Sequence, residues 1–410
     1  MTALYLLILV DSISATVLIP LLGPLLIDQA TLVFLAGASL PLRNFVSGLL
    51  VATYVLLMLY MAPVLGRLSD QWGRRPVLLL CTVGLLVGNL LAGLAIECGS
   101  LALLFLGRIV GGATAAAQST AQAALVDRGG NKARLLSYSL LFSSLGFVLG
   151  PVLATGLSPF SFAAPLHLCA LLTVAALVFL YRDRDGAREA PAAARRIDWS
   201  AISPWEGVTC FRDAAGDAAV RGLLGGFILM QVAWGGFFVF VSVYLMEAPH
   251  LDLTLSQVGL FMAIIGIGFC LSNGLVQPLL AERFAMRTLA VAGLALNALT
   301  MVLCLLATSA LQAYAAGLLA GITINIAYPS TVTMLSDRVP PGRQGWILGM
   351  VGSAAAMGWA ISSVVSGVLG GLGHALPVGL AAVLMGGAAA VTMVVGAGQV
   401  SVSEARGQCD

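Results

Sequence analysis

Twelve long apolar runs dominate this chain and limit what it can fold into. A bilayer-crossing helix takes about 20 mostly apolar residues, and polar or turn-rich breaks separate runs of that length. We place them at 3–27, 45–66, 76–97, 101–126, 135–157, 163–181, 222–246, 256–280, 288–308, 311–335, 345–371 and 376–397. Of the 410 residues, 60% are hydrophobic and 9% charged, against about a quarter charged in soluble domains. The sequence predicts an all-α membrane protein with twelve transmembrane helices.

The positions of lysine and arginine predict the orientation, because these residues accumulate on the cytoplasmic side. With the N-terminus inside, only Arg43 falls in an outer loop and only Arg108 lies deep in a span. The first run lacks a basic segment before it and contains Asp11, so we interpret it as a retained span. We predict an integral protein of a bacterial inner membrane with both termini in the cytoplasm.

A polar interval between Arg182 and Arg221 divides the spans into six and six. We predict an N-terminal six-helix bundle over 1–181, a cytoplasmic linker over 182–221, and a C-terminal six-helix bundle with a short cytoplasmic tail over 222–410. Within the linker, Trp199, Trp205 and Phe211 lie among charges. Two interpretations remain open, a segment at the membrane surface and a plain tether.

Several classes of function are not expected. A net charge of +2 does not favour a nucleic-acid partner, and the seven cysteines are scattered without a CxxC or Cys/His cluster. We find no phosphate-binding glycine loop and no nucleophile arrangement. The sequence therefore predicts neither an enzyme nor a bound metal or cofactor.

The stretch GRLSDQWGRRP, residues 66–76, concentrates charge between the second and third spans. Arginines there suit membrane topology, but Asp70 contributes little to topology, and glycines flank it. The residues that match G-x-L-S-D-x-x-G-R-R are Gly66, Leu68, Ser69, Asp70, Gly73, Arg74 and Arg75. On these residues the chain resembles the major facilitator superfamily.

That resemblance implies the major facilitator fold and a conformational latch. In the family, the aspartate of this loop interacts with the far bundle in the outward-open state, which assigns the latch to Gly66, Asp70, Gly73, Arg74 and Arg75. The corresponding loop after the eighth span, LLAERFAMR, has Ala281 near the aspartate position. We expect the second latch to be degenerate or absent.

Two more stretches resemble the same family. In LGRIVGGATAAAQ, Arg108 and Gly112 match a motif with a membrane-embedded arginine. In GFVLGPVLATG the matching residues of G-x-x-x-G-P-x-x-x-G are Gly146, Gly150, Pro151 and Gly156. The family associates that motif with antiporters and exporters, although Ala154 and Thr155 replace glycines often found there. The alternative is simple helix packing, because small residues four apart are common where membrane helices approach closely.

By the same resemblance, spans 1, 4, 7 and 10 line a central cavity between the bundles. Helical spacing places Arg108, Gly112, Ser119 and Gln122 on one face of span 4, Gln231, Trp234, Phe238 and Ser242 on span 7, and Asn325 and Tyr328 on span 10. Such a surface suits an amphipathic organic substrate. Alternatively, the amides bond between helices, and Tyr328 with Pro329 marks a helix break. Trp346 and Trp359 of span 11 have two interpretations, a drug-binding surface and helix packing, and we assign them to packing.

Asp11 and Arg108 are the deep ionisable residues of the spans. At about 1.5 Å per residue, Asp11 lies about 13 Å from the cytoplasmic start of span 1 and Arg108 about 10 Å from the outer start of span 4. We predict that Asp11 carries a coupling proton and that Arg108 tunes it. A permanent ion pair that only orders the bundle is the alternative.

Together these features predict a secondary active transporter that works by alternating access, as a proton-coupled exporter of small hydrophobic or amphipathic organic compounds. Its expected partners are a small-molecule substrate, protons and the lipid bilayer, and we expect a monomer. One alternative transports a specific metabolite, siderophore or sugar whose carboxylate binds Arg108. Another is a membrane sensor that does not transport.

Overall fold

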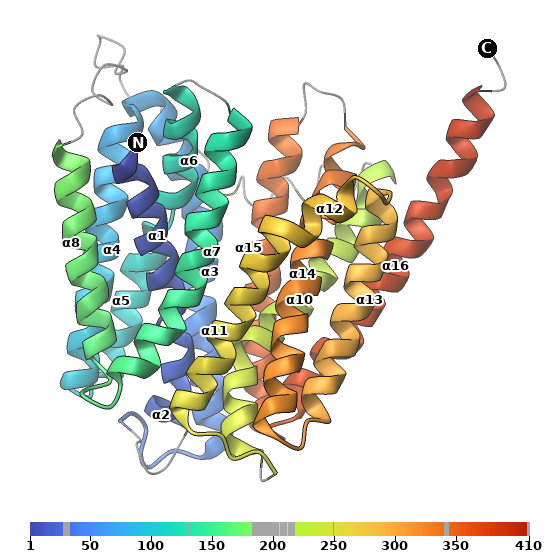
Figure 1. Ribbon diagram of the computed structural model, residues 1–410. Helices are drawn as coiled ribbons and strands as arrows, with labels where there is room; N and C mark the ends of the chain where they lie inside the picture. The colour runs from blue at the N-terminus through green and yellow to red at the C-terminus, as the bar shows by residue number, and fades with distance from the viewer. Residues whose placement is uncertain are drawn as a thin grey trace.

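The computed structural model describes residues 1–27, 33–128, 132–182, 205, 211, 218–248, 250–339 and 344–407. Twelve helices in these ranges are long and apolar enough to cross a membrane, as the sequence predicts. The described backbone contains no strand. Helices before residue 183 lie on one side of the molecule and those after residue 217 on the other (Figure 1). We call these groups the N-half and the C-half.

The N-half contains eight α-helical segments that make six spans. They are α1 (Thr2–Thr16), α2 (Leu22–Leu26), α3 (Leu40–Trp72), α4 (Arg74–Glu97), α5 (Leu101–Ala113), α6 (Ala117–Asp127), α7 (Lys132–Leu157) and α8 (Ala164–Arg182). A short 3₁₀ turn, η1 (Ile19–Leu21), joins α1 to α2 within the first span. The fourth span consists of α5 and α6 together.

The C-half repeats this plan. Its elements are α10 (Ala218–Glu247), α11 (Leu255–Leu271), η4 (Ser272–Val276), α12 (Gln277–Ala281), α13 (Met286–Leu305), α14 (Ala310–Ser336), α15 (Gln344–Gly370) and α16 (Leu376–Gly407). The eighth span runs through α11, the π-helical turn η4 and α12. The last helix, α16, continues ten residues beyond the expected end of its apolar run and projects from the body of the molecule (Figure 1).

Span 4 is interrupted where the sequence predicts one continuous helix. The Thr114 hydroxyl donates to the main-chain oxygens of Val110 (2.9 Å) and Gly111 (3.3 Å). Hydroxyl groups that bond to the preceding turn bend helices, and the glycines before Thr114 favour helix weakly. The chain leaves the helix at Thr114 and re-enters it at Ala117. The expected common face of span 4 is therefore divided between two helices.

Span 10 shows the opposite difference. The expectation that Tyr328 and Pro329 mark a helix break is wrong, because α14 runs without interruption from Ala310 to Ser336 with Pro329 inside it. Side chains on the same helix bond to carbonyl groups around the proline. Ser330 Oγ donates to Ile326 O (2.7 Å) and Thr333 Oγ1 to Pro329 O (2.8 Å). Neither bond reaches the main-chain oxygen of Asn325, which is the carbonyl that loses its helical donor at Pro329.

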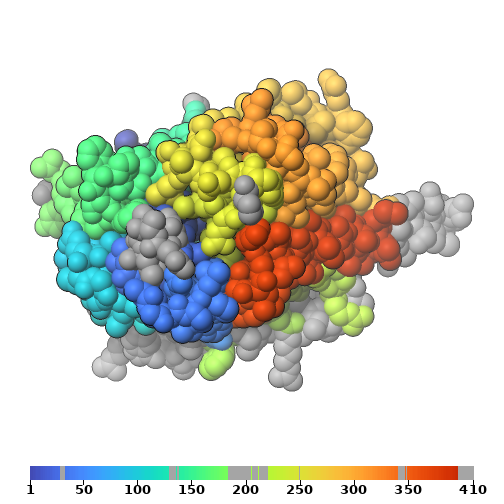
Figure 2. All heavy atoms as spheres, turned by 90° about the horizontal axis from the view of Figure 1, so that it is seen from below, coloured from blue at the N-terminus to red at the C-terminus, as the bar shows by residue number. Residues whose placement is uncertain are grey.

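The two halves pack closely at the end of the molecule opposite residues 66–76, which we call the far end (Figure 2). On α3, a Cβ added to Gly48 would lie 2.1 Å from the main-chain oxygen of Ser363 on α15. On α11, a Cβ added to Gly259 would lie 1.8 Å from Oγ1 of Thr155 on α7. Small residues permit such close approach of membrane helices. The pairs α3–α15 and α7–α11 therefore form a tight seam between the halves.

We call the end that carries residues 66–76 the motif end. There, the faces of α3 and α15 that touch at the far end are no longer in contact. Along α15, Ala360 and Ala356 follow Ser363 on one face and are buried, whereas Gly352 farther along that face is exposed. Added Cβ atoms at Gly352 and at Gly66 of α3 would have no heavy atom within 4 Å. The halves are therefore closed together at the far end and separated at the motif end.

Candidate functional site

Residues 66–76 are mostly helical rather than a loop, which corrects the sequence prediction. The helix α3 continues to Trp72, and α4 begins at Arg74, so Gly73 alone joins the two helices. Gly73 has a φ of 99°, a backbone conformation that side chains disfavour. The motif thus places the end of α3 directly against the first turn of α4.

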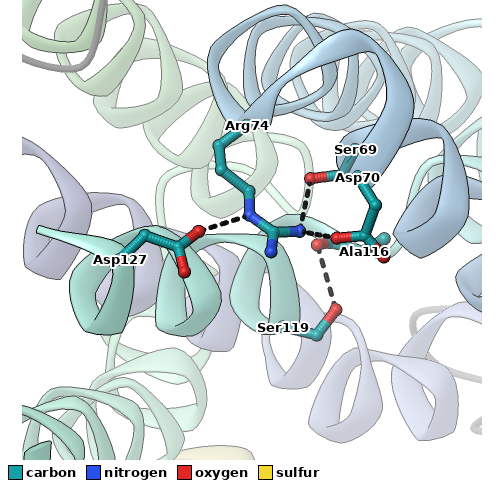
Figure 3. Close-up of polar contacts among 6 residues, drawn as sticks. All are labelled: Ser69, Asp70, Arg74, Ala116, Ser119 and Asp127. Atoms are coloured by element: carbon teal, nitrogen blue, oxygen red, sulfur yellow. Dashed lines mark hydrogen bonds and ion pairs between the residues drawn. The ribbon is translucent and has the colours of Figure 1, made fainter. Parts of the chain in front are cut away.

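Arg74 gathers the polar side chains of this junction (Figure 3). Its Nη1 donates to Asp70 Oδ1 (2.5 Å) and to Ser69 Oγ (3.1 Å) on α3. Its Nε donates to Asp127 Oδ2 (2.8 Å) at the end of α6. All these partners belong to the N-half. Within the described contacts, Asp70 does not reach the C-half.

Arg75 and Arg287 make equivalent contacts in the two halves. Arg75 Nη2 donates to Tyr181 O (2.8 Å) near the C-terminal end of α8. Arg287 Nη2 donates to Met393 O (2.9 Å) on α16, and both pairs are 106 residues apart in sequence. Tyr181 lies in the last turn of α8, where carbonyl groups lack partners within the helix and an arginine can satisfy them. Met393 lies inside α16, fourteen residues before its end, so this reason does not apply to it. Among the described residues of 281–287, no ion pair within 4.0 Å corresponds to that of Asp70.

The glycines of the span 5 motif hold α7 against α1. A Cβ added to Gly146 would lie 2.4 Å from Cβ of Ser12, and one added to Gly150 would lie 2.0 Å from Oγ1 of Thr16. Pro151 lies inside α7, and Gly156 has open space around it. The first two glycines therefore pack the N-half together, while Thr155 contacts the C-half through Gly259.

Arg108 lies inside the N-half beside α3. Its Nε donates to the main-chain oxygen of Leu50 (3.3 Å), and its guanidinium carbon lies 4.3 Å from the centroid of the Tyr54 ring. A cavity of about 20 Å³ adjoins it, with Ser14, Tyr54, Asn89 and Arg108 as its polar lining. That volume holds about one water molecule. Asn89 Nδ2 donates to Ser14 Oγ across the cavity wall (3.0 Å).

Asp11 lies on α1 in the same half. It is partly buried and makes no hydrogen bond or ion pair within the described part of the chain. Asp11 and Arg108 therefore form no ion pair within 4.0 Å in the described part of the chain. The alternative of a permanent ion pair does not match this geometry.

Other polar residues of span 4 face α7. Gln122 Nε2 donates to Ser139 Oγ (2.8 Å) and Gln118 Nε2 to Ser143 Oγ (3.3 Å). Ser119 Oγ donates to Ala116 O in the first turn of its own helix (3.2 Å; Figure 3). Gln122 therefore bonds between helices, and it does not share a surface with Arg108.

An aromatic cluster occupies the middle of the C-half and its boundary with the N-half. The Trp234 ring on α10 lies 5.8 Å from Phe238 and 6.0 Å from Phe269 of α11. Phe147 of α7 adds an edge contact at 6.2 Å to Phe269, and Trp359 of α15 lies 5.9 Å from Phe238. We call these five residues the aromatic cluster. The sequence predicts Trp234 and Phe238 in the cavity, whereas the prediction for Trp359 was packing.

Phe147 and Phe269 were not expected because they lie on spans 5 and 8, outside the helices assigned to the cavity. Their signal in the sequence is weak, since a phenylalanine in an apolar run is unremarkable for a membrane helix. Only the side-by-side packing of α7, α10 and α11 brings them to Trp234. Aromatic pairs at these distances attract each other beyond simple area burial.

The remaining residues expected in the cavity lie outside the aromatic cluster. Gln231 is buried where α10 meets Gly358 of α15. Asn325 Nδ2 donates to Gly321 O of its own helix (3.2 Å). The Tyr328 ring lies 5.7 Å from Phe227. Among the residues that the structure places, no group of three or more His, Cys, Asp or Glu side chains is arranged to hold a metal.

Comparisons with known proteins assign the chain to a family. The Major Facilitator Superfamily profile matches residues 4–279 and 248–406. Over 315 residues, 76% of each chain, the sequence is 30% identical to Tetracycline resistance protein, class C, of Escherichia coli. It is 26% identical to the class E protein of Escherichia coli over 87% of this chain and 84% of that protein.

Solved structures share the fold. The human organic anion transporter MFSD10 (TETRAN) superposes with a TM-score of 0.69 at 20% identity, covering 95% of this chain and 98% of that one. A POT family transporter in complex with 5-aminolevulinic acid gives a TM-score of 0.74 at 12% identity, covering 96% and 94%. On the profile match and the twelve apolar helices, this chain belongs to the major facilitator superfamily.

Proposed function

We propose that this protein is a proton-coupled exporter of small hydrophobic or amphipathic organic compounds, and that it works by alternating access. The observation that carries the proposal is Asp11, a partly buried carboxylate in a span without a partner in the described structure. Ionisable groups inside a membrane span are costly and commonly belong to proton or substrate pathways. Similarity to tetracycline resistance proteins supports export, because a transporter that protects a cell removes the compound from it.

The packing of the halves supports alternating access. We assign the motif end to the cytoplasm, so the seam at the far end closes the outer side and the cytoplasmic side is open. In the opposite state, the α3 face that carries Gly66 would pack on the α15 face that carries Gly352, repeating the contact of Gly48 with Ser363. Asp70 would then meet the C-half and latch it. The helix pair α3–α15 would thus be closed by Gly48 and Ser363 in one state and by Gly66 and Gly352 in the other.

The two halves divide the work in this proposal. The N-half binds the coupling proton at Asp11, with Arg108 adjusting its affinity. The C-half contributes Trp234, Phe238 and Trp359 to binding the apolar part of the substrate. Rigid aromatic surfaces suit planar organic compounds, which fits relatives named for tetracycline resistance.

The first alternative, a specific anionic metabolite bound by Arg108, has less support. The Arg108 guanidinium is stacked on Tyr54 and bonded to Leu50, beside a cavity of about 20 Å³. A space for about one water does not accept a metabolite carboxylate in this state. The sensor alternative predicts binding without flux, so a transport measurement separates it.

Transport is tested in inverted membrane vesicles with tetracycline as the probe. An acidic lumen should drive tetracycline into the lumen, because protons leaving the vesicle exchange for it, and a protonophore should abolish the uptake. Vesicles without the protein are the control. Uptake that does not depend on the pH gradient would contradict proton coupling. Tetracycline binding without uptake would favour the membrane sensor.

Orientation is tested by cysteine labelling in a cysteine-free variant. We propose that both termini are cytoplasmic in a bacterial inner membrane. We also propose that the protein is a monomer without enzyme activity.

Two positions suit the labelling of the two sides. Phe160 is 84% exposed between α7 and α8, and Phe284 is 50% exposed before α13. In intact cells an impermeant reagent should label Phe160→Cys and not Phe284→Cys. The reverse pattern would overturn the orientation.

A further inference from the structure

The seam between α7 and span 8 follows one face of span 8 from the far end toward the middle of the molecule (Figure 1). Gly259 meets Thr155, and seven residues later a Cβ added to Gly266 would lie 2.4 Å from Cγ2 of Val148. Both glycines are buried, whereas Asn273, another seven residues along, is exposed. Residues seven apart share a helix face. Asn273 therefore continues the line of the two glycines to the place where the halves begin to separate.

A hydrogen bond joins the two halves at this place. The Asn273 amide nitrogen, Nδ2, donates to Oγ of Ser144 on α7 (3.4 Å). Ser144 is buried in the N-half, so the longer and exposed Asn273 side chain reaches across to it. The seam thus changes from close backbone packing at the glycines to a contact between two polar side chains.

The π turn η4 positions Asn273. The main-chain N–H of Gln277 donates to Ser272 O, five residues back, and Pro278 follows it without an N–H of its own. Ser272 Oγ donates to Ile322 O on α14 (3.0 Å). The turn is therefore fixed to the C-half by one side chain, while the next side chain contacts the N-half. Single π turns within helices occur frequently at functional positions.

The two kinds of contact tolerate motion differently. Close packing at a glycine is either made or lost, because packed surfaces do not deform continuously. An exposed amide can turn about its side-chain bonds and keep its hydrogen bond while the helix axes rotate. When two helices rock against each other, their separation changes least between the closed part and the separated part of the pair. Asn273 and Ser144 lie at that level.

We propose that Asn273 and Ser144 form the pivot between α7 and span 8, a contact that persists while the far end opens and the motif end closes. The inference rests on the alternating access of the proposed function. It separates this contact from the seam at the far end, which must break in every cycle. A link across the pivot should therefore be tolerated, and a link across the seam should not.

Cross-linking tests this difference in a cysteine-free variant. Asn273→Cys with Ser144→Cys is joined by a short bis-methanethiosulfonate reagent, and tetracycline uptake into inverted vesicles should stay within about twofold of the unlinked protein. The comparison is Asn44→Cys on α3 with Gly370→Cys on α15, at the far end. A Cβ added to Gly370 would lie 3.4 Å from Asn44 Oδ1, so these cysteines suit a direct disulfide. That disulfide should abolish uptake, and its reduction should restore uptake.

Substitutions test the contact without any substrate. Asn273→Ala and Ser144→Ala should each lower the Tm, and the double variant should lower it no more than the larger single effect, because the two residues share one bond. Ser143→Ala is the control, since Ser143 contacts Ser12 within the N-half (3.0 Å), and its effect should add to that of Asn273→Ala. Labelling of Asn44→Cys from outside should stay within about twofold in Asn273→Ala, because a contact kept in both states favours neither.

Three results would overturn the pivot. They are loss of uptake on linking positions 273 and 144, purely additive effects of Asn273→Ala and Ser144→Ala on the Tm, and a change of about fivefold or more in the outside labelling. Uptake that survives the disulfide between positions 44 and 370 would also overturn it, because the far end would then not need to open. If the wild type takes up no tetracycline, the proposed function fails, while the unfolding cycle and the labelling still decide the role of Asn273.

Discussion

The N-half and the C-half share one plan and differ in chemistry. Both have six spans, and Arg75 and Arg287 contact the sixth span of their halves in the same way. The N-half places Asp11 and Arg108 inside the membrane, whereas the middle of the described C-half spans carries aromatic rings and no charged side chain. In the function proposed above, one scaffold used twice carries a proton site in one half and an apolar binding surface in the other.

The largest effect should come from the N-half. Asp11→Asn should reduce pH-driven tetracycline uptake to the level of vesicles without the protein, because the coupling proton loses its carrier. Exchange without a gradient should persist. Asp252→Asn makes the same chemical change at an exposed position near the outer end of α11 and should leave both rates unchanged. If pH-driven uptake persisted in Asp11→Asn, a residue other than Asp11 would carry the coupling proton.

The seam should give the next largest effect, since the two halves must open and close there. Gly259→Ala puts a methyl group against Thr155, and overpacking costs about 1 to 3 kcal/mol. That shifts the balance of states by about 5- to 150-fold. Transport should slow, and a cysteine at Asn44, fully buried in the α3–α15 contact, should become reachable from outside. Thr155→Gly should restore both properties, and absence of rescue would show that the clash is not the cause.

A smaller effect is expected in the aromatic cluster. Trp359→Ala should raise the KM for tetracycline about two- to tenfold, because an aromatic contact contributes about 0.5 to 1.5 kcal/mol. The ratio of pH-driven uptake to exchange should not change, since the proton site lies in the other half. Trp72→Ala, at the exposed end of α3, is the matched control. If Trp359→Ala changed the ratio of pH-driven uptake to exchange, proton coupling and substrate binding would not be separated between the two halves.

The smallest effect is expected at the latch. The Asp70 side chain is 63% exposed, and exposed ion pairs contribute about 0.2 to 1 kcal/mol. Asp70→Asn should therefore slow transport by no more than about fivefold while tetracycline binding is kept. Glu282→Gln, in the corresponding segment of the C-half, should have no effect. Equal effects of the two substitutions would mean that both halves carry a latch.

The architecture was largely predictable because long apolar runs and basic loops are strong, local signals. The positions of Asp70, Arg74 and Arg75 followed from a motif of seven residues. The break after Ala113 was not predictable. It depends on whether the main-chain oxygens of Val110 and Gly111 accept hydrogen bonds from the Thr114 hydroxyl or from the backbone amides of a continuous helix. The neighbours of Arg108 were equally hidden. Tyr54 reaches it from another span, and a tyrosine in an apolar run gives no sign of which helix it faces.

The aromatic cluster shows the same limit. Trp234 and Phe238 share one face of one helix, so spacing alone brings them together. Phe147, Phe269 and Trp359 join them only because three other helices cross at that level. Their contribution depends on how the halves meet, which hydropathy does not encode.

The most direct test of the account is proton release on substrate binding. Purified protein in weakly buffered detergent solution is mixed with tetracycline while a pH indicator records the medium, for the wild type and for Asp11→Asn. We expect the wild type to release protons as tetracycline binds, and Asp11→Asn to bind tetracycline without releasing them. Equal release by both proteins, or none by the wild type, would contradict the central claim that Asp11 couples protons to export.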